Sequence, residues 1–259
     1  MSLQRSAKSP ETGATVIIPA RYGSSRFPGK PLVSLCGKPM IQHVYERAKA
    51  SAGVRRVLVA TDDRRIAETV ASFGGETWVS TAPFRTGTDR VAAAARELSG
   101  TVFVNLQGDE IPLDPGMLSD LILPFLESGA PMGTLMRPLT DPAELSNPGV
   151  VKAVANAAGE ALYFSRAPIP WVRDAAPGTP AVGLHYIHLG VYIYTRPTLD
   201  RLASLPTSPL EEAEKLEQLR ALANGITIRV WTTRHPSLRL DSPADVDGAE
   251  AALQRLVAC

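Results

Sequence analysis

Short apolar runs alternate with segments in which apolar residues recur every three or four positions, and this alternation continues to about residue 126. Residues 15–20 are typical of a buried strand, and Met40, Ile41, Val44 and Ala48 fall on one helical face. The same patterns predict strands at 56–61, 76–80 and 101–106, and helices at 63–73, 88–98 and 115–126. This strand–helix rhythm predicts an α/β fold with a doubly wound, mostly parallel sheet.

The pattern changes between residues 131 and 195, where strands are separated by proline and glycine turns. We interpret this segment as a small strand-rich insertion within a single domain, 15–259, that follows a polar tail, 1–14. Its expected strands are 132–138, 150–156, 161–166 and 184–195. After it we expect helices at 197–205 and 208–224, a strand at 226–232 and a last helix at 243–257.

Charge and cysteine content narrow the possible functions. The 259 residues include 27 Lys and Arg against 26 Asp and Glu, so no overall positive field would attract nucleic acid or an anionic membrane. Any anionic ligand must therefore be bound by a local group of cations. No apolar run approaches the roughly 18 residues of a membrane helix, and Cys36 and Cys259 form no zinc or redox motif. We expect a cytoplasmic protein that is neither exported nor inserted.

The loop that follows the first predicted strand, 21–31, concentrates glycine, serine and basic residues. Glycine lets the backbone approach a polyanion, the hydroxyls of Ser24 and Ser25 donate hydrogen bonds, and the cations offset phosphate charge. The cations are Arg21, Arg26 and Lys30. The loop is not a Walker A motif, because five residues separate its two glycines and proline follows the lysine. It predicts a triphosphate site, although a solvated turn is the alternative.

Two aspartates are candidates for a metal site. Asp109 follows the predicted strand 101–106, at the edge where open α/β sheets bind ligands. Asp241 precedes Ser242 and Pro243, which form a plausible helix start, so Asp241 could instead be a cap or turn residue. Mg²⁺ in phosphoryl chemistry is usually held by one or two carboxylates together with phosphate oxygens. The pair is therefore a candidate Mg²⁺ site.

An ordered set of motifs resembles the 3-deoxy-manno-octulosonate (Kdo) cytidylyltransferase family, also called CMP-Kdo synthetases. The match covers about residues 15–255 and includes the segments 18–32, 37–41, 59–62, 86–90, 105–110, 162–166, 188–192 and 216–220. The resemblance implies a Rossmann-like nucleotide-diphosphosugar transferase fold, usually a homodimer, that uses CTP and Mg²⁺. It also implies transfer of CMP to the anomeric hydroxyl of Kdo, with release of pyrophosphate. In this reading, segment 131–195 serves sugar binding and dimerisation.

The resemblance also assigns residues to each part of the site. Catalysis is assigned to Arg21, Lys30, Asp109 and Asp241, and the metal to the two aspartates. Nucleotide contacts are assigned to Pro19, Ala20, Arg21, Ser24, Ser25, Arg26, Lys30, Ala82, Thr86, Gly87, Arg90 and Gln107. The acidic sugar is assigned to Arg166, His188, Tyr192, Glu217 and Gln218, with the Arg166 guanidinium as a two-pronged partner for its carboxylate. Thr88 is expected only to cap its helix.

Two departures from the family pattern leave the acceptor open. Ile111 stands where the family has proline, with Pro112 one place later, and Ser242 replaces a threonine. Neither change removes a carboxylate, but the first can reshape the turn beside Asp109. A sialic or other ulosonic acid is therefore an alternative acceptor, and a catalytically silent nucleotide-binding subunit is an alternative of another class. A lone histidine such as His188 is, by itself, more often structural than ligand-binding.

Overall fold

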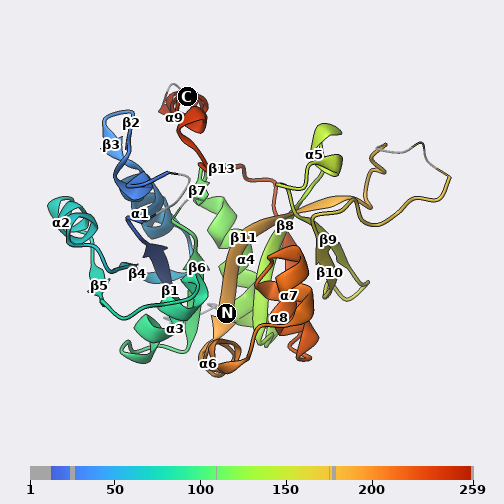
Figure 1. The fold of residues 1–259 in the computed structure, drawn as a ribbon, viewed down its shortest axis with the longest axis horizontal. Coiled ribbons are helices and arrows are strands. Elements are labelled where there is room, and N and C mark those ends of the chain that lie inside the picture. Colours follow the sequence, from blue (N-terminus) through green and yellow to red (C-terminus); the bar gives the residue numbers. More distant parts are fainter. Residues whose placement is uncertain (1–12, 24–26, 109, 175, 177–178, 258–259) are drawn as a thin grey trace, which may run out of the picture.

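The computed structural model describes residues 13–23, 27–108, 110–174, 176 and 179–257. In this part of the chain nine strands form one mixed sheet (Figure 1). Along its main path lie β10 (Ala161–Ser165), β9 (Lys152–Ala155), β11 (Tyr186–Thr195), β6 (Val102–Leu106), β1 (Ala14–Ala20), β4 (Val54–Thr61) and β5 (Thr77–Val79). The other two strands are β8 (Met132–Pro138), which pairs with β11, and β12 (Ile228–Thr232), which pairs with β8.

The half of the sheet from β5 to β6 is parallel and covered on both faces, as the alternating pattern predicts. Along β1, Val16 and Ile18 face one apolar core and Ile17 faces the other. The first core is completed by α1 (Met40–Ala50), α2 (Arg64–Ser72), α4 (Gly116–Ser128) and α9 (Val246–Val257). The second is completed by α3 (Gly87–Arg96), α6 (Arg196–Ser204) and α8 (Gln218–Ala223). The predicted doubly wound fold is confirmed.

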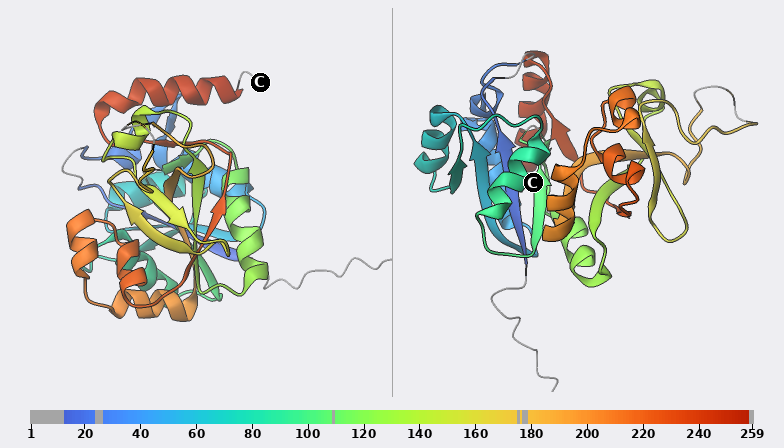
Figure 2. Two further views of the ribbon diagram at one scale, coloured as in Figure 1. Left: turned by 90° about the vertical axis from the view of Figure 1, so that its right-hand side faces the viewer. Right: turned by 60° about the horizontal axis from the view of Figure 1, so that its bottom comes forward.

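The strand-rich segment 131–195 continues the same sheet. Strand β11 pairs antiparallel with β6 through its last residues and with β9 through Tyr186 and Ile187, so it joins the two halves. The described residues between β10 and β11 stand away from the body of the molecule (Figure 2). The expected antiparallel strands are confirmed, whereas the role of the segment stays a prediction.

The predicted helix 208–224 is wrong as a single element. It forms two short helices, α7 (Pro209–Glu214) and α8, separated by Lys215 in the left-handed conformation with φ 53°. Ser208 and Glu211 form a capping box at the start of α7, and Arg220 of α8 turns back to make a buried ion pair with Glu211. This break places Glu217 at the first turn of α8, beside the sheet.

Several short elements were not predicted, because two to four residues carry no readable periodicity. They are η1 (Lys30–Leu32), β2 (Ser34–Leu35), β3 (Lys38–Pro39), β7 (Glu110–Pro112), α5 (Ala143–Ser146) and β13 (Ser237–Arg239). The pairing of β7 with β13 matters for function, because it brings the residues after β6 next to the loop that carries Asp241. The last predicted helix begins as η2 (Pro243–Asp245) before α9.

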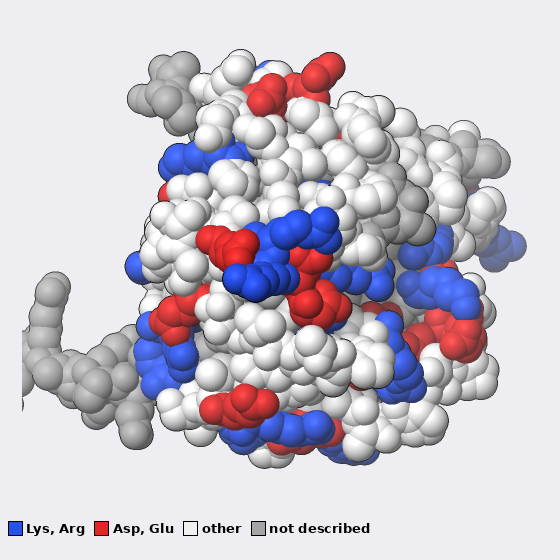
Figure 3. All heavy atoms as spheres, turned by 60° about the vertical axis from the view of Figure 1, so that its left-hand side comes forward, with Lys and Arg blue, Asp and Glu red and all other residues white. Residues whose placement is uncertain are grey.

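Surface charge agrees with the balanced composition. On the face shown in Figure 3, acidic and basic side chains are interspersed, without a broad region of one sign. Within the described residues, the structure contains no helix both long and apolar enough to cross a bilayer.

Candidate active site

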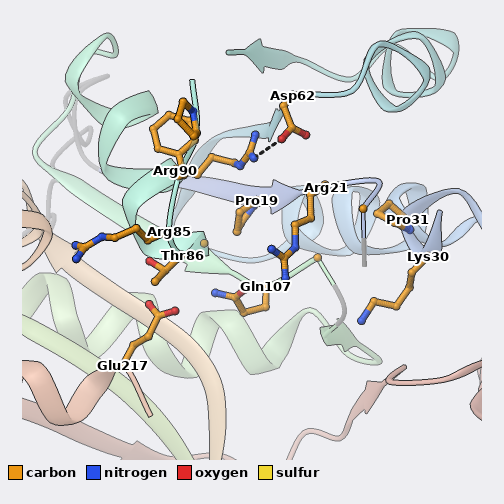
Figure 4. A pocket seen from close by; sticks show the side chains of 16 residues that line it. Pro19, Arg21, Lys30, Pro31, Asp62, Arg85, Thr86, Arg90, Gln107 and Glu217 are labelled. Carbon is orange, nitrogen blue, oxygen red and sulfur yellow. Dashed lines mark hydrogen bonds and ion pairs between the residues drawn. The ribbon is translucent and has the colours of Figure 1, made fainter. Parts of the chain in front are cut away.

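Two cavities adjoin at the carboxyl ends of β1 and β6, where a parallel sheet binds ligands. The first, of about 540 Å³, is walled by the end of β1, the following loop and the start of α3 (Figure 4). The second, of about 420 Å³, is walled by β11, the α7–α8 junction and β13. Gln107 and Glu217 line both cavities. The site is therefore divided into two chambers with a shared wall.

The loop after β1 brings its cations to the first cavity. Pro19, Ala20, Arg21 and Lys30 all line it, and their contact with the nucleotide stays a prediction. The Lys30 Nζ also donates a hydrogen bond of 2.8 Å to the carbonyl oxygen of Leu240, which ties this loop to the one carrying Asp241. Ser24, Ser25 and Arg26 lie outside the described residues.

Gly108 allows the ends of β1 and β6 to approach closely beside the cavity. A Cβ atom at this position would lie 2.9 Å from the carbonyl oxygen of Pro19, so a larger residue would force the two strand ends apart. Gln107, the preceding residue, donates through Nε2 to the Asn105 side chain at 3.0 Å and faces the junction of the two cavities.

The expected capping role of Thr88 is wrong. Thr86 is the N-cap of α3, and its Oγ1 accepts a hydrogen bond of 3.1 Å from the backbone N–H of Asp89. The Thr88 hydroxyl instead donates to Glu217 at 2.6 Å and accepts from the Asn105 amide at 3.2 Å. It thereby connects the start of α3 to the wall that the two cavities share. Thr86 and Gly87 line the first cavity.

Arg90 lies on the wall of the first cavity with 6% of its surface exposed. Its Nη2 donates to Asp62 at 2.7 Å, and its guanidinium lies over the Phe84 ring. Its Nη1 is buried and has no hydrogen-bond partner among the described residues. A buried donor without a partner favours a ligand contact at this end of the cavity.

The structure does not bring Ala82 into the wall, where its neighbours Pro83 and Phe84 lie instead. Sequence reasoning missed Asp62, Phe84 and Arg85 as lining residues. Only Asp62 had a signal, because it directly follows the second predicted strand.

Asp241 lies next to the first cavity, because the preceding Leu240 carbonyl accepts from Lys30. The alternative that Asp241 is a helix cap is wrong: Ser242 is the N-cap of η2, and the Asp245 carboxylate accepts from the Ser242 and Asp241 N–H groups at 2.7 and 2.8 Å. The Asp241 Oδ2 forms an ion pair of 3.1 Å with Arg239 Nε. Asp109 lies outside the described residues.

The described residues fit a divalent cation held mainly by its substrate. No group of three or more histidine, cysteine, aspartate or glutamate side chains comes together among the residues described. A complete protein cage is therefore not present in that part of the chain. Asp241 supplies one carboxylate on the loop that Lys30 ties to the first cavity, and a carboxylate is a donor that a divalent cation uses when phosphate oxygens supply the remaining ligands.

All five predicted sugar residues line the second cavity: Arg166, His188, Tyr192, Glu217 and Gln218. Burial raises the pKa values of Glu217 and Tyr192 and lowers the pKa of His188 to about 3. The His188 ring packs against the Phe164 and Tyr192 rings. At neutral pH this wall therefore presents a neutral imidazole and a neutral phenol.

The hydrogen-bond partner of His188, Thr134, determines which ring nitrogen carries the proton. The Thr134 hydroxyl donates to the carbonyl oxygen of Val191 at 2.7 Å and lies 3.0 Å from His188 Nε2. Because that hydroxyl proton is already used, Nε2 carries the imidazole proton and donates it to Thr134. Nδ1 is left as an acceptor.

The low pKa of His188 predicts a pH-dependent stability. Between pH 3 and 6.5 the unfolded chain binds a proton that the folded chain excludes, so stability falls as the pH falls through this window. For a pKa lowered from 6.5 to about 3, the loss in unfolding free energy at pH 5 is about 2 kcal/mol. His188→Gln should make the difference in unfolding free energy between pH 8 and pH 5 smaller by about that amount, measured by urea denaturation. Equal differences in the two proteins would contradict this.

The predicted role of Arg166 as a two-pronged carboxylate partner does not match its geometry. Arg166 reaches the second cavity, but its guanidinium donates to the carbonyl oxygens of Glu214 at 2.6 Å, Pro148 at 2.8 Å and Lys215 at 3.4 Å. These bonds hold the junction between α7 and α8. The break at Lys215, which exposes these carbonyls, was not visible in the sequence pattern.

A basic cavity large enough for a nucleotide and an adjoining polar cavity, at the ligand edge of a doubly wound sheet, are the arrangement of a nucleotidyltransferase. Residues 15–228 match the cytidylyltransferase family. A 3-deoxy-manno-octulosonate cytidylyltransferase of Syntrophotalea carbinolica is 50% identical over 93% of this chain and 99% of its own length. The chain therefore belongs to the 3-deoxy-manno-octulosonate cytidylyltransferase family, as the motifs indicate.

Solved structures agree with this assignment. The structure of a CMP:2-keto-3-deoxy-manno-octonic acid synthetase complexed with CTP is 40% identical, with a TM-score of 0.87, and the match covers 94% of this chain and 99% of that one. An inositol-1-phosphate CTP transferase from T. maritima is 15% identical, with a TM-score of 0.67 over 95% of this chain and 96% of its own. This second likeness supports the fold alone.

Proposed function

We propose that this protein transfers CMP from CTP to the anomeric hydroxyl of 3-deoxy-manno-octulosonate and releases pyrophosphate. The observation that carries the proposal is the divided site, in which a basic cavity and a polar cavity share Gln107 and Glu217. A nucleotide and a sugar bound on the two sides of this wall would meet at it. The relatives that cover nearly the whole chain carry this activity in their names.

In this proposal CTP lies in the first cavity and the sugar lies in the second. Thr86, Gly87 and Arg90 receive the cytosine and ribose end, and Arg21 and Lys30 receive the phosphates. His188, Tyr192, Glu217 and Gln218 present polar atoms to the sugar hydroxyls. The 2-hydroxyl then attacks the α-phosphorus in line and gives up its proton to solvent. The bond between the α-phosphorus and the oxygen that bridges to the β-phosphorus breaks, and Arg21 and Lys30 stabilise the charge on the departing pyrophosphate.

Asp241 and Asp109 would hold a divalent cation, which we propose is Mg²⁺. When bound, it would neutralise phosphate charge and lower the pKa of the attacking hydroxyl. The chain's own contribution is the tie between Lys30 and Leu240, which keeps the Asp241 loop against the phosphate cavity.

We also propose a cytoplasmic homodimer that acts in lipopolysaccharide biosynthesis, without nucleic-acid or membrane partners. Four exposed large apolar side chains, which a monomer would leave in water, belong to β10 and the segment that follows it in the sequence: Leu162, Trp171, Val182 and Leu184. Sedimentation of the protein should give twice the 27.7 kDa chain mass. The variant Trp171→Ser should shift the measured mass toward that of the monomer. A wild-type protein that sediments as a monomer would contradict the proposal.

A pyrophosphate-release assay across a panel of acceptors tests the reaction. With CTP and a divalent cation, turnover should be highest with 3-deoxy-manno-octulosonate and much lower with sialic acids. Turnover with sialic acid instead would favour the alternative acceptor. Turnover only with neutral sugar 1-phosphates would contradict an acidic acceptor, and no turnover with any acceptor, together with intact CTP binding, would favour a silent nucleotide-binding subunit.

A further inference from the structure

An acidic acceptor needs a cation in a cavity that is otherwise unfavourable to it. The described wall of the second cavity contains three carboxylates: Glu110, Glu144 and Glu217. A sugar carboxylate that enters this space is repelled by any of them that is ionised, unless a guanidinium or ammonium group faces it. The wall also contains four basic residues, Arg137, Arg166, Lys215 and Arg239, and these differ in what already occupies their donors.

Three of the four already bond to other protein atoms. Arg137 is held by Glu144 through both terminal nitrogens, one of the bonds measuring 3.0 Å. The Arg166 guanidinium donates to three backbone carbonyls. Lys215 pairs with Glu212 at 2.6 Å, and 73% of its side chain is exposed. The Lys215 ammonium keeps two further N–H donors, but they are not the planar, paired donors of a guanidinium.

Arg239 differs because its ion pair is made through Nε, which lies 3.1 Å from Asp241 Oδ2. Its terminal nitrogens have no hydrogen-bond partner within the described ranges of the chain. About half of its side chain is exposed, so a ligand can reach it. After burial, the positive charge of Arg239 is the second cause that lowers the pKa of His188, a residue on the wall of the same cavity.

The position of Arg239 is set by the short β7–β13 ladder, in which it stands opposite Glu110. On this ladder it lies between the second cavity and Asp241. A guanidinium can hold two carboxylates at once, one through Nε and one through its terminal nitrogens. Arg239 can therefore keep its contact with Asp241 while it binds an anion in the second cavity.

We propose that Arg239 binds the carboxylate of the acceptor sugar and makes the enzyme select acidic acceptors. This inference rests on the proposed function and names a residue for a role that sequence reasoning assigned to Arg166. In it, Arg166 is a positioning residue that holds the α7–α8 junction and Glu217. The sugar carboxylate lies near Asp241, so acceptor binding is coupled to the phosphate end of the site.

The test compares the acidic acceptor with its carboxamide, which keeps the shape and loses the charge. Arg239→Gln should raise the KM for the acid by about tenfold, equivalent to about 1.4 kcal/mol, and leave the KM for CTP nearly unchanged. The ratio of kcat/KM for acid to that for amide should fall by the same factor. Using the ratio cancels any general effect of Arg239 on Asp241. Arg239→Lys, which keeps charge but loses the fork, should give an intermediate ratio.

Two control variants separate selectivity from folding. Arg166→Gln should lower the melting temperature and reduce turnover of acid and amide alike. Arg64→Gln removes an exposed arginine on α2 and should change neither the melting temperature nor the turnover of the two acceptors. An unchanged acid-to-amide ratio in a folded, active Arg239→Gln protein would overturn the role of Arg239 alone. A wild type active only with neutral sugar 1-phosphates would overturn the proposed function, and this inference with it.

Discussion

Replacing Asp241 by alanine should lower kcat by about a thousandfold, equivalent to about 4 kcal/mol of activation free energy. The expected cause is loss of a carboxylate that holds the divalent cation beside the α-phosphate. Asp241 is suited to this role because it directly follows Leu240, whose carbonyl accepts the Lys30 hydrogen bond at the phosphate cavity. Steady-state pyrophosphate release at saturating CTP and acceptor measures the effect.

Asp245→Ala is the matched control for this variant. Asp245, the last residue of η2, accepts through its carboxylate from the backbone N–H groups of Asp241 and Ser242. Its loss should cost about 1 kcal/mol of stability and lower turnover far less than removal of the Asp241 carboxylate. Asp241→Asn should keep the fold and require a higher concentration of the cation for half-maximal rate. If Asp241→Ala retains more than about a tenth of the wild-type rate, less than about 1.4 kcal/mol of barrier, Asp241 is not a metal ligand.

The parallel half of the fold could be predicted because its signals are local. The strand ending at Ala20, the basic loop after it and the helix face of Met40 and Ile41 each occupy a short stretch of sequence. Buried strands covered on both faces are continuously apolar, and the residues after them lie at the ligand edge. The loop could therefore be assigned to phosphates before any contact was known.

The acceptor side could be predicted less well because its contacts are distant in sequence. The hydrogen bond from Thr88 to Glu217 spans 129 positions, and that from Lys30 to Leu240 spans 210. The turn at Lys215 has positive φ at a residue that is not glycine, which no pattern indicates. That turn decides that Arg166 faces backbone carbonyls. The short strand carrying Arg239 is likewise formed only by its pairing with β7.

Replacing Lys30 by alanine should lower kcat/KM for CTP by about a hundredfold, equivalent to about 2.7 kcal/mol. Two effects contribute. The ammonium group no longer offsets the charge of the departing pyrophosphate, and the hydrogen bond to Leu240 that holds the Asp241 loop is lost. Lys30→Arg should recover part of the loss, because it restores charge but not the compact ammonium geometry. Lys38→Ala, which removes an exposed ion pair with Glu46, should leave the rate unchanged.

The double variant Lys30→Ala/Asp241→Ala separates these two effects. If Lys30 acts only by stabilising the departing pyrophosphate, the fold-losses in rate of the two single variants should multiply in the double variant. If it also positions Asp241, the second substitution should cost much less once the first is made, because the position that Lys30 holds no longer matters. We expect the second result, since one hydrogen bond joins Lys30 to the residue before Asp241. Calorimetry that shows unchanged CTP affinity in Lys30→Ala, together with unchanged turnover, would remove Lys30 from the phosphate site altogether.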